Sequence, residues 1–226
     1  MGRAKYTEQE RHRIILHLLT CARTLLEEDG IEQVSIRRIA QAAGCTSTTL
    51  YQYFEDVDEI LSLASMGYLE SCYRELLSEL PGLQSPYEIY LRSCRIYSQH
   101  AFSHPWIFRH LLFHPHTRPL RDTIARYYEE IYPGLPAGKD ETVFKMIADG
   151  DFLGHNVRIL RPLSRACGMD EAGTRLLGDI TTSYFKMLLD ERCAGTHPPQ
   201  TQVDRMLELV DFLLKEKFEN SQENRD

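Results

Sequence analysis

The chain has 226 residues, of which 42% are hydrophobic and 26% charged, and its formal net charge is −7. This composition excludes a disordered chain, and the acidic balance excludes a protein that coats nucleic acid over its whole surface. No stretch approaches the roughly 18 uninterrupted apolar residues of a membrane-spanning helix, and no secretory apolar region follows the first residues. We therefore expect a cytoplasmic protein that makes no contact with a membrane.

Charge is distributed unevenly along the sequence. Residues 1–54 hold seven Lys or Arg against six acidic residues, whereas the remainder holds 19 basic against 27 acidic residues. Because residues 1–54 are nearly neutral and the remainder is acidic, a contact with nucleic acid is expected at the N-terminal segment rather than over the whole surface.

The first predicted helix begins at a capping box. The Thr7 hydroxyl can accept the backbone amide of Glu10, whose carboxylate can reach back to the cap. Apolar residues then recur at helical spacing until Gly30, which ends the helix.

Two short helices are predicted next, separated by a tight turn. Ser35 caps the first of them and Gly44 ends it, while Thr46 or Ser47 caps the second, which runs to about Tyr53. Two short helices joined by a tight glycine-containing turn form the helix-turn-helix pattern. A structural helix pair without a DNA role is the alternative interpretation.

The rest of the sequence predicts only further helices. Asp56 and Glu59 form another capping box, and Ser85 with Pro86 begins a helix by the rule that places serine at the cap and proline after it. The predicted helices cover about residues 57–80, 86–103, 105–113, 119–132, 141–161, 170–192 and 201–218. Residues 133–138 are predicted as a loop. The predicted fold class is all-α, with about 9–10 helices.

Residues 34–54, VSIRRIAQAAGCTSTTLYQYF, and the continuation EDVDEIL resemble tetracycline-repressor-like (TetR-family) transcriptional regulators. The resemblance is specific over about residues 8–65. It implies a helix-turn-helix DNA-binding domain over residues 1–55, a helical ligand-binding and dimerisation domain over 56–219, and a frayed tail over 220–226. It also implies a homodimer, in most cases a repressor, that leaves operator DNA when a small effector binds. Such a regulator is not an enzyme, and we expect no cofactor.

The positions that match DNA-contacting sites of the family lie on the second and third helices. They are Arg37, Thr46, Ser47, Thr48, Thr49, Tyr51, Gln52 and Tyr53. Gln52 has the chemistry to contact an adenine edge, and threonine methyl groups can touch thymine methyls. Tyr51, Tyr53 and Thr46 suit phosphate contacts, which position the protein without specifying sequence.

One position departs from the family pattern. Family members commonly carry a lysine at the start of the fourth helix, where it approaches a phosphate, but this chain has Val57 flanked by four acidic residues. We expect weaker nonspecific affinity and a shallower dependence of affinity on salt than in a lysine-bearing relative.

Residues 87–113 are rich in aromatic side chains and histidines. One interpretation is an effector cavity with aromatic walls and a few polar groups, which would make the effector largely apolar or aromatic. The other is an ordinary helical core. The candidate ligand-binding residues are Tyr97, Trp106, His110, Phe113, Phe144 and His155.

Two alternatives to an organic effector come from the histidines between His100 and His116. Their spacing, as in His100 with His104 and His110 with His114, can place two imidazoles on one helix face and would suit a metal-responsive regulator. Pro105 interrupts the helix of the first pair and Pro115 follows the second. No cysteine or carboxylate completes an obvious ligand set, so we assign no metal ligands. The six cysteines stand singly without a Cys-x-x-Cys pair and are expected to be reduced thiols. A helical enzyme using the same segment is the other alternative.

The C-terminal helices carry apolar stripes that suit dimerisation. One stripe holds Leu176, Ile180, Tyr184 and Met187, and the other holds Val203, Leu207, Val210 and Leu214. Packing within one chain explains both stripes equally well.

Overall fold

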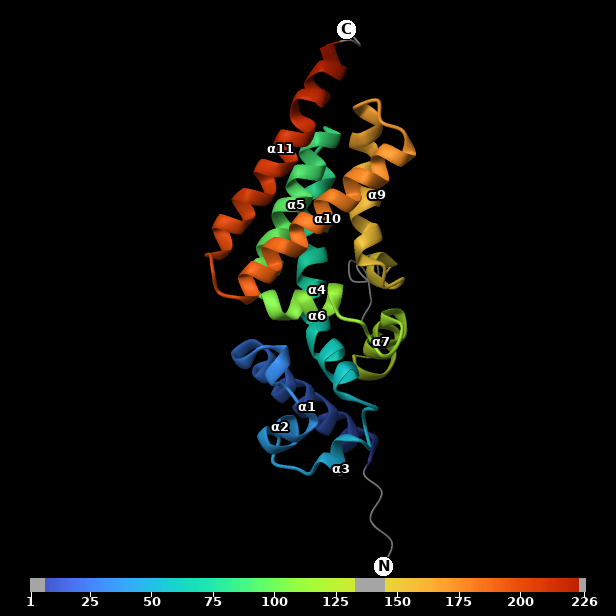
Figure 1. Ribbon diagram of the computed structural model, residues 1–226. Coiled ribbons are helices and arrows are strands. Elements are labelled where there is room, and N and C mark those ends of the chain that lie inside the picture. The colour runs from blue at the N-terminus through green and yellow to red at the C-terminus, as the bar shows by residue number, and fades with distance from the viewer. Residues whose placement is uncertain (1–6, 133–144, 224–226) are drawn as a thin grey trace, which may run out of the picture. The chain divides into compact units, whose positions relative to one another are not determined.

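The computed structural model describes residues 7–132 and 145–223. Over these residues the regular secondary structure is helical and contains no strand, which confirms the predicted all-α fold class. The chain divides into two compact units (Figure 1). The N-terminal unit comprises the described parts of residues 1–69 and 114–150, and the C-terminal unit those of 70–113 and 151–226. None of the described helices has an apolar stretch long enough to cross a membrane.

The N-terminal unit begins with three α-helices. They are α1 (Glu8–Asp29), α2 (Ile36–Ala42) and α3 (Ser47–Leu50), with the short 3₁₀ helix η1 (Ile31–Gln33) after α1. The predicted caps are present, because Thr7 and Glu10 form the reciprocal capping box of α1 and Ser35 accepts the amide of Arg38.

A compact apolar core fixes the angle between these helices. Leu26 of α1, Ile39 of α2 and Leu50 of α3 are fully buried. Between α2 and α3, Gly44 adopts a φ of +67°. The amide of Cys45 donates to the carbonyl of Ala40, which closes the C-terminal turn of α2. The tight turn predicted from Gly44 is thus formed.

The remainder of the N-terminal unit consists of the start of α4 (Val57–Glu79), α7 (Leu120–Arg126) and the π-helical turn η3 (Tyr127–Ile131). Residues 57–69 of α4 belong to this unit and residues 70–79 to the C-terminal unit. The turn η3 packs against α1.

The C-terminal unit is a helical bundle. It contains η2 (Leu80–Gly82), α5 (Pro86–Ser103), α6 (Pro105–Phe113), α9 (Phe152–Ala166), α10 (Glu171–Cys193) and α11 (Pro199–Glu223). In Figure 1, α11, drawn in red, runs alongside α5, drawn in green, and the two helices pack against each other. Val203, Val210 and Leu214 of α11 are buried in this bundle. The apolar stripe of α11 therefore packs within the chain.

The predicted helix over residues 141–161 is wrong in its boundaries. Residues 133–144, including the predicted loop and the candidate ligand residue Phe144, lie outside the described residues. Gly150 adopts a φ of +68°, and α9 begins afterwards with Asp151 as its cap. The helix then passes through Pro162 to Ala166, because buried neighbours such as Leu163 hold it although proline removes one hydrogen bond.

Three other boundaries differ from the sequence expectations. Helix α3 ends at Leu50, and residues 51–53 form a turn in which the amide of Tyr53 donates to Leu50. The C-terminal helix reaches Glu223, so residues 220–223 are helical. The two compact units do not divide at residues 55 and 56, because residues 114–132 join the N-terminal unit.

We predict that Gly150→Ala destabilises the protein by about 1–3 kcal/mol, because a left-handed backbone is strained for alanine. Its Cβ would also lie 2.9 Å from the backbone nitrogen of Arg121. Chemical unfolding measures the effect.

Substitution of two other glycines separates the two causes of destabilisation, which are backbone strain and the close contact of the new Cβ. Gly168 has a φ of +71° with open space around a Cβ, and Gly82 has open space without a positive φ. The losses should therefore fall in the order Gly150→Ala, Gly168→Ala, Gly82→Ala, and an equal loss in all three would contradict the explanation.

Candidate DNA interface and ligand cavity

The helix-turn-helix presents polar side chains to solvent from α2, α3 and the turn after α3. Seven of the eight candidate DNA-binding residues are exposed or half-buried, and Tyr51 has 59% of its surface exposed. The exposed members are Arg37, Thr46, Thr48, Tyr51 and Gln52, and the half-buried members are Ser47 and Thr49. Polar side chains on a rigid short-helix scaffold can reach base edges and phosphates.

Tyr53 differs from the other seven candidates. It has only 7% of its surface exposed, and the Arg11 guanidinium lies 6.0 Å from the centre of its ring. Its aromatic ring therefore serves the packing of this unit, and the predicted phosphate contact finds no support at this residue.

The hydroxyl of Thr46 also has a structural role. It accepts the backbone amide of Thr49 at 3.3 Å and lies 3.0 Å from the Thr49 hydroxyl. This bond fixes the first turn of α3, as expected of an N-cap threonine. Substituting either threonine would change both the cap and any DNA contact, so neither residue is a clean probe of DNA binding.

Arg126 of α7 holds the end of the helix-turn-helix against the start of α4. Its guanidinium donates to the backbone carbonyl of Tyr53 at 2.6 Å and to the Glu59 carboxylate at 2.6 Å. It also lies over the Phe54 ring, 5.3 Å from the centroid. Because Glu59 is only 4% exposed, its carboxylate needs such a charged partner.

The acidic residues around Val57 are paired in the same region. The second oxygen of the Glu59 carboxylate accepts the backbone amide of Glu55 at 2.7 Å, and Arg118 forms an ion pair with Glu55. Asp56 accepts the hydroxyl of Thr117 at 2.8 Å. The acidic run is thus partly neutralised and bonded within the unit, which reduces the phosphate repulsion expected from the sequence.

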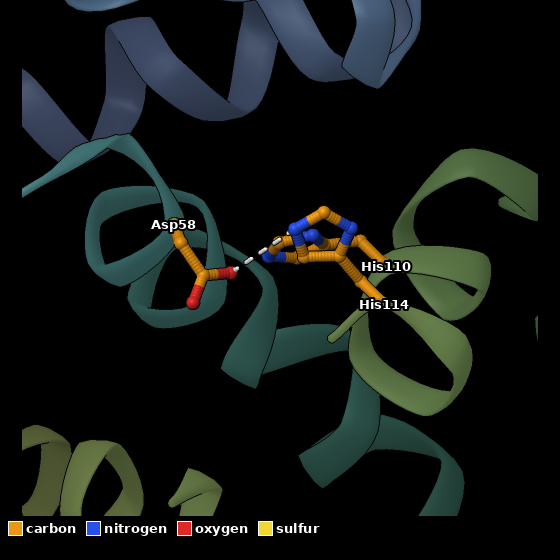
Figure 2. A group of neighbouring side chains, drawn as sticks. All are labelled: Asp58, His110 and His114. Atoms are coloured by element: carbon orange, nitrogen blue, oxygen red, sulfur yellow. Dashed lines mark ion pairs between the residues drawn. The ribbon is translucent and has the colours of Figure 1, made fainter. Parts of the chain in front are cut away.

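Asp58 receives several donors from the chain that follows α6. Its carboxylate accepts the backbone amide of Thr117 at 2.8 Å, and His116 Nδ1 lies 3.0 Å from it. Figure 2 shows the ion pair between Asp58 and His114, whose Nε2 lies 3.9 Å from the carboxylate. The third side chain drawn, His110, belongs to the C-terminal unit. Residues 114–117 are thereby tied to the first turn of α4.

The C-terminal unit contains a cavity of about 650 Å³, a volume that includes the space at its mouth. Its walls come from α4, α5, α6, α9, α10 and α11, and most of the wall surface is apolar. The described lining residues are Tyr73, Leu76, Tyr90, Ser93, Cys94, Tyr97, Ser98, Leu112, Phe152, Leu153, His155, Asn156, Ile159, Thr181, Thr182, Phe185 and Met206. Such a lining is typical of small-molecule sites.

A hydrogen-bond network crosses one wall of the cavity. The Asn156 amide donates to the hydroxyls of Thr181 at 3.0 Å and Thr182 at 3.1 Å, and its oxygen accepts the Tyr90 hydroxyl at 3.0 Å. The Tyr73 hydroxyl is bonded to His155 Nδ1. These bonds fix the orientation of the polar groups before any ligand arrives.

The structure brings two of the predicted ligand residues into this lining, Tyr97 and His155. Trp106, His110 and Phe113 of α6 are not among the lining residues, although Phe113 packs on Phe185 at a ring separation of 6.5 Å. Sequence reasoning missed the contributions of α4 and α10, including Tyr73 and Thr181. The only feature of the sequence that could have indicated these residues is that each is a polar or aromatic residue within the apolar stripe of its helix.

Comparison with known proteins finds its sequence matches in the first part of the chain. Residues 18–63 match the family model described as "Bacterial regulatory proteins, tetR family". The HTH-type transcriptional regulator HbdR of Aromatoleum sp. (strain CIB) is 34% identical over 84 residues, which are 37% of this chain and 35% of that relative. The chain thus matches about a third of the length of this curated relative.

Two solved structures share the fold over nearly the whole chain. RolR in complex with resorcinol has a TM-score of 0.54 at 20% identity, with 95% of this chain and 96% of that chain covered. FadR of Thermus thermophilus in complex with lauroyl-CoA has a TM-score of 0.52 at 16% identity, with 87% and 92% covered. At these identities the likeness establishes the fold.

We predict that Arg126→Gln destabilises the protein by about 2–4 kcal/mol, because it leaves the Glu59 carboxylate buried without its closest cation. Urea unfolding measures the change. Arg92→Gln is the control, because Arg92 and Glu79 form an exposed ion pair, and it should cost less than about 1 kcal/mol. Equal losses for the two variants would show that Glu59 does not depend on Arg126.

Proposed function

We propose that this chain, whose residues 18–63 match the model of the tetR family of bacterial regulatory proteins, is a transcriptional regulator of that family and acts as a repressor. It binds operator DNA as a homodimer and is released by a small, largely apolar or aromatic effector. The observation that carries the proposal is the exposed polar surface of α2 and α3, which lies within the segment that matches the family model.

The DNA contacts divide into two kinds. Gln52 and Thr48 are exposed and can contact base edges, Gln52 through a bidentate pair with adenine and Thr48 through its methyl group. Arg37 and Tyr51 are exposed and can contact phosphates, which fixes the position of the protein on the duplex. Sequence preference therefore resides chiefly in Gln52, and general affinity in Arg37.

Exposed apolar side chains on the C-terminal helices support the homodimer. Leu176, Ile180 and Met187 of α10 are 40–62% exposed, and Phe212 of α11 is 86% exposed. Large apolar side chains gathered on an outer helix face mark an interaction surface, and a twofold dimer is the commonest symmetric assembly. The buried stripe of α11 takes no part in this interface.

The cavity supports an organic effector. Two structural neighbours, RolR and FadR, were solved with resorcinol and lauroyl-CoA respectively, so this fold accommodates small organic ligands in those proteins. In this chain the wall is aromatic and has a fixed polar side, which suits a small, mainly apolar ligand.

The helix α4 offers a route from effector to DNA. Tyr73 and Leu76 of α4 line the cavity, and Glu59 of the same helix is bonded to Arg126, which holds the end of the helix-turn-helix. An effector that favours one position of α4 would shift the population of DNA-binding dimers. The shift is limited to the difference in effector affinity between the two states.

Among the described residues, no observation within either unit favours the metal-responsive alternative or the helical enzyme. His100, for example, is bonded to Glu75 at 2.8 Å, and His116 to Asp58. A single function is therefore proposed.

A mobility shift on the DNA upstream of the chain's own gene tests DNA binding. Arg37→Ala should weaken binding to all duplexes to a similar degree, because it removes a phosphate contact. Gln52→Ala should cost about 1–3 kcal/mol on the preferred site and less elsewhere, because it removes a base contact. Arg23→Ala is the control, since Arg23 is an exposed residue of α1 outside the proposed interface. If the wild-type protein binds none of these duplexes, or if all three variants bind equally well, the proposal fails.

We also predict that Val57→Lys steepens the dependence of DNA affinity on salt by about 0.9 in the logarithmic slope for each further phosphate that the protein neutralises. Val57 is half-buried at the first position of α4. Val57→Met, which adds length without charge, should leave the slope unchanged. Identical slopes for the lysine variant and the wild type would refute a phosphate near this position.

A further inference from the structure

The lining of the cavity in the C-terminal unit is poor in residues that can carry a charge. Among the described residues that line the cavity, none is Asp, Glu, Lys or Arg. Transfer of an ionised group from water into such a site is costly unless a counter-charge or several hydrogen bonds receive it. The lining therefore favours an uncharged ligand.

Most polar groups of the lining are already bonded within the protein. Asn156 is engaged with Tyr90, Thr181 and Thr182, and the Ser93 hydroxyl donates to the carbonyl of Ile89 at 2.7 Å. A ligand would benefit little from competing for these groups, since each new bond would replace an existing one.

The Tyr97 hydroxyl differs from these groups. It is buried and has no hydrogen-bond partner among the described residues, and burial raises its pKa well above the ordinary value, so the proton stays on the oxygen. Leaving a buried hydroxyl unbonded costs free energy that a partner would recover. Its ring belongs to the lining and packs against Phe108 and Phe185, with centroids 5.9 and 5.8 Å away.

The thiol of Cys94 in the cavity lining is not expected to bind a ligand covalently. Complete burial raises the pKa of Cys94 to about 12, so the thiol remains protonated near neutral pH. The thiolate is the nucleophilic form of cysteine. A ligand in this cavity is therefore held by contacts alone.

We propose that the effector is an uncharged aromatic molecule with a hydroxyl or carbonyl oxygen that forms a hydrogen bond with the Tyr97 hydroxyl. The aromatic walls receive its ring. The described lining offers no Lys or Arg to pair with a carboxylate or phosphate, and its His155 is already bonded to the Tyr73 hydroxyl, so the site disfavours such ligands. This inference rests on the proposed function and adds the chemical class of the effector.

The test measures binding to the full-length protein by isothermal titration calorimetry at neutral pH. Four probes share one benzene ring: p-cresol, acetophenone, toluene and benzoate. We expect p-cresol and acetophenone to bind roughly tenfold more tightly than toluene, because each adds one hydrogen bond to a buried group. Benzoate, which is ionised at this pH, should bind more weakly than toluene.

The variant Tyr97→Phe isolates the hydrogen bond. It should weaken p-cresol and acetophenone roughly tenfold and leave toluene unchanged, without lowering the melting temperature, because the hydroxyl that it removes has no partner to lose among the described residues. Tyr87→Phe is the control. The Tyr87 hydroxyl is bonded to Asp211 and lies outside the lining, so this variant should leave all four affinities unchanged.

Three outcomes would overturn the inference. They are tight binding of benzoate, equal affinities for p-cresol and toluene, and failure of every uncharged probe to bind. A separate mobility shift with p-cresol distinguishes this inference from the proposed function. If p-cresol binds through Tyr97 but DNA affinity does not change, the cavity chemistry stands and the effector-controlled release from DNA fails.

Discussion

The buried carboxylate of Glu59 is the constraint on which the N-terminal unit depends. A carboxylate in this position is stable only with a cation and with hydrogen bonds to its remaining oxygens. Arg126 supplies the cation from a distant part of the sequence, and the amide of Glu55 supplies a further hydrogen bond. Because Arg126 also holds the carbonyl of Tyr53, the helix-turn-helix, the start of α4 and α7 fold as one unit. The segment that follows residue 113 therefore packs with the helix-turn-helix and the start of α4, although more than 50 residues separate the bonded partners in sequence.

Helix α4 carries both the buried Glu59 carboxylate and part of the cavity lining. The first turn of α4 carries Asp58 and Glu59, which are bonded to Thr117 and Arg126 of the N-terminal unit, and later turns carry Tyr73 of the cavity lining. A change in the position of α4 that a ligand favours would alter the environment of two buried carboxylates. Such carboxylates tolerate little change in their partners, because unpaired buried charge is costly. In the proposed mechanism, α4 would move between a few discrete positions in which these carboxylates keep partners, which is the property that a switch requires.

The two candidate regions were predictable to different degrees. The proposed DNA interface lies in one continuous segment, so cap residues, a small turn and exposed polar side chains were visible in the sequence, although the burial of Tyr53 was not. The cavity draws on six helices, and its residues are spread over more than 130 positions from Tyr73 to Met206. The aromatic and histidine-rich stretch predicted Tyr97 correctly as a lining residue but also suggested Trp106, which lies elsewhere. Composition alone does not reveal which side of α6 faces the cavity.

The sequence by itself determined the local features of this protein. These are the helical class, the caps at Thr7, Ser35 and Ser85, and the helix-turn-helix, because each depends on residues within one or two turns of helix. Tertiary structure decided which distant residues meet. It joined Arg126 to Glu59, buried the stripe of α11 against α5, and left the described cavity lining without Asp, Glu, Lys or Arg. The physical reason is that a side chain's spacing along a helix gives the face on which it lies, whereas the identity of the partner on that face follows only from the packing of the whole chain.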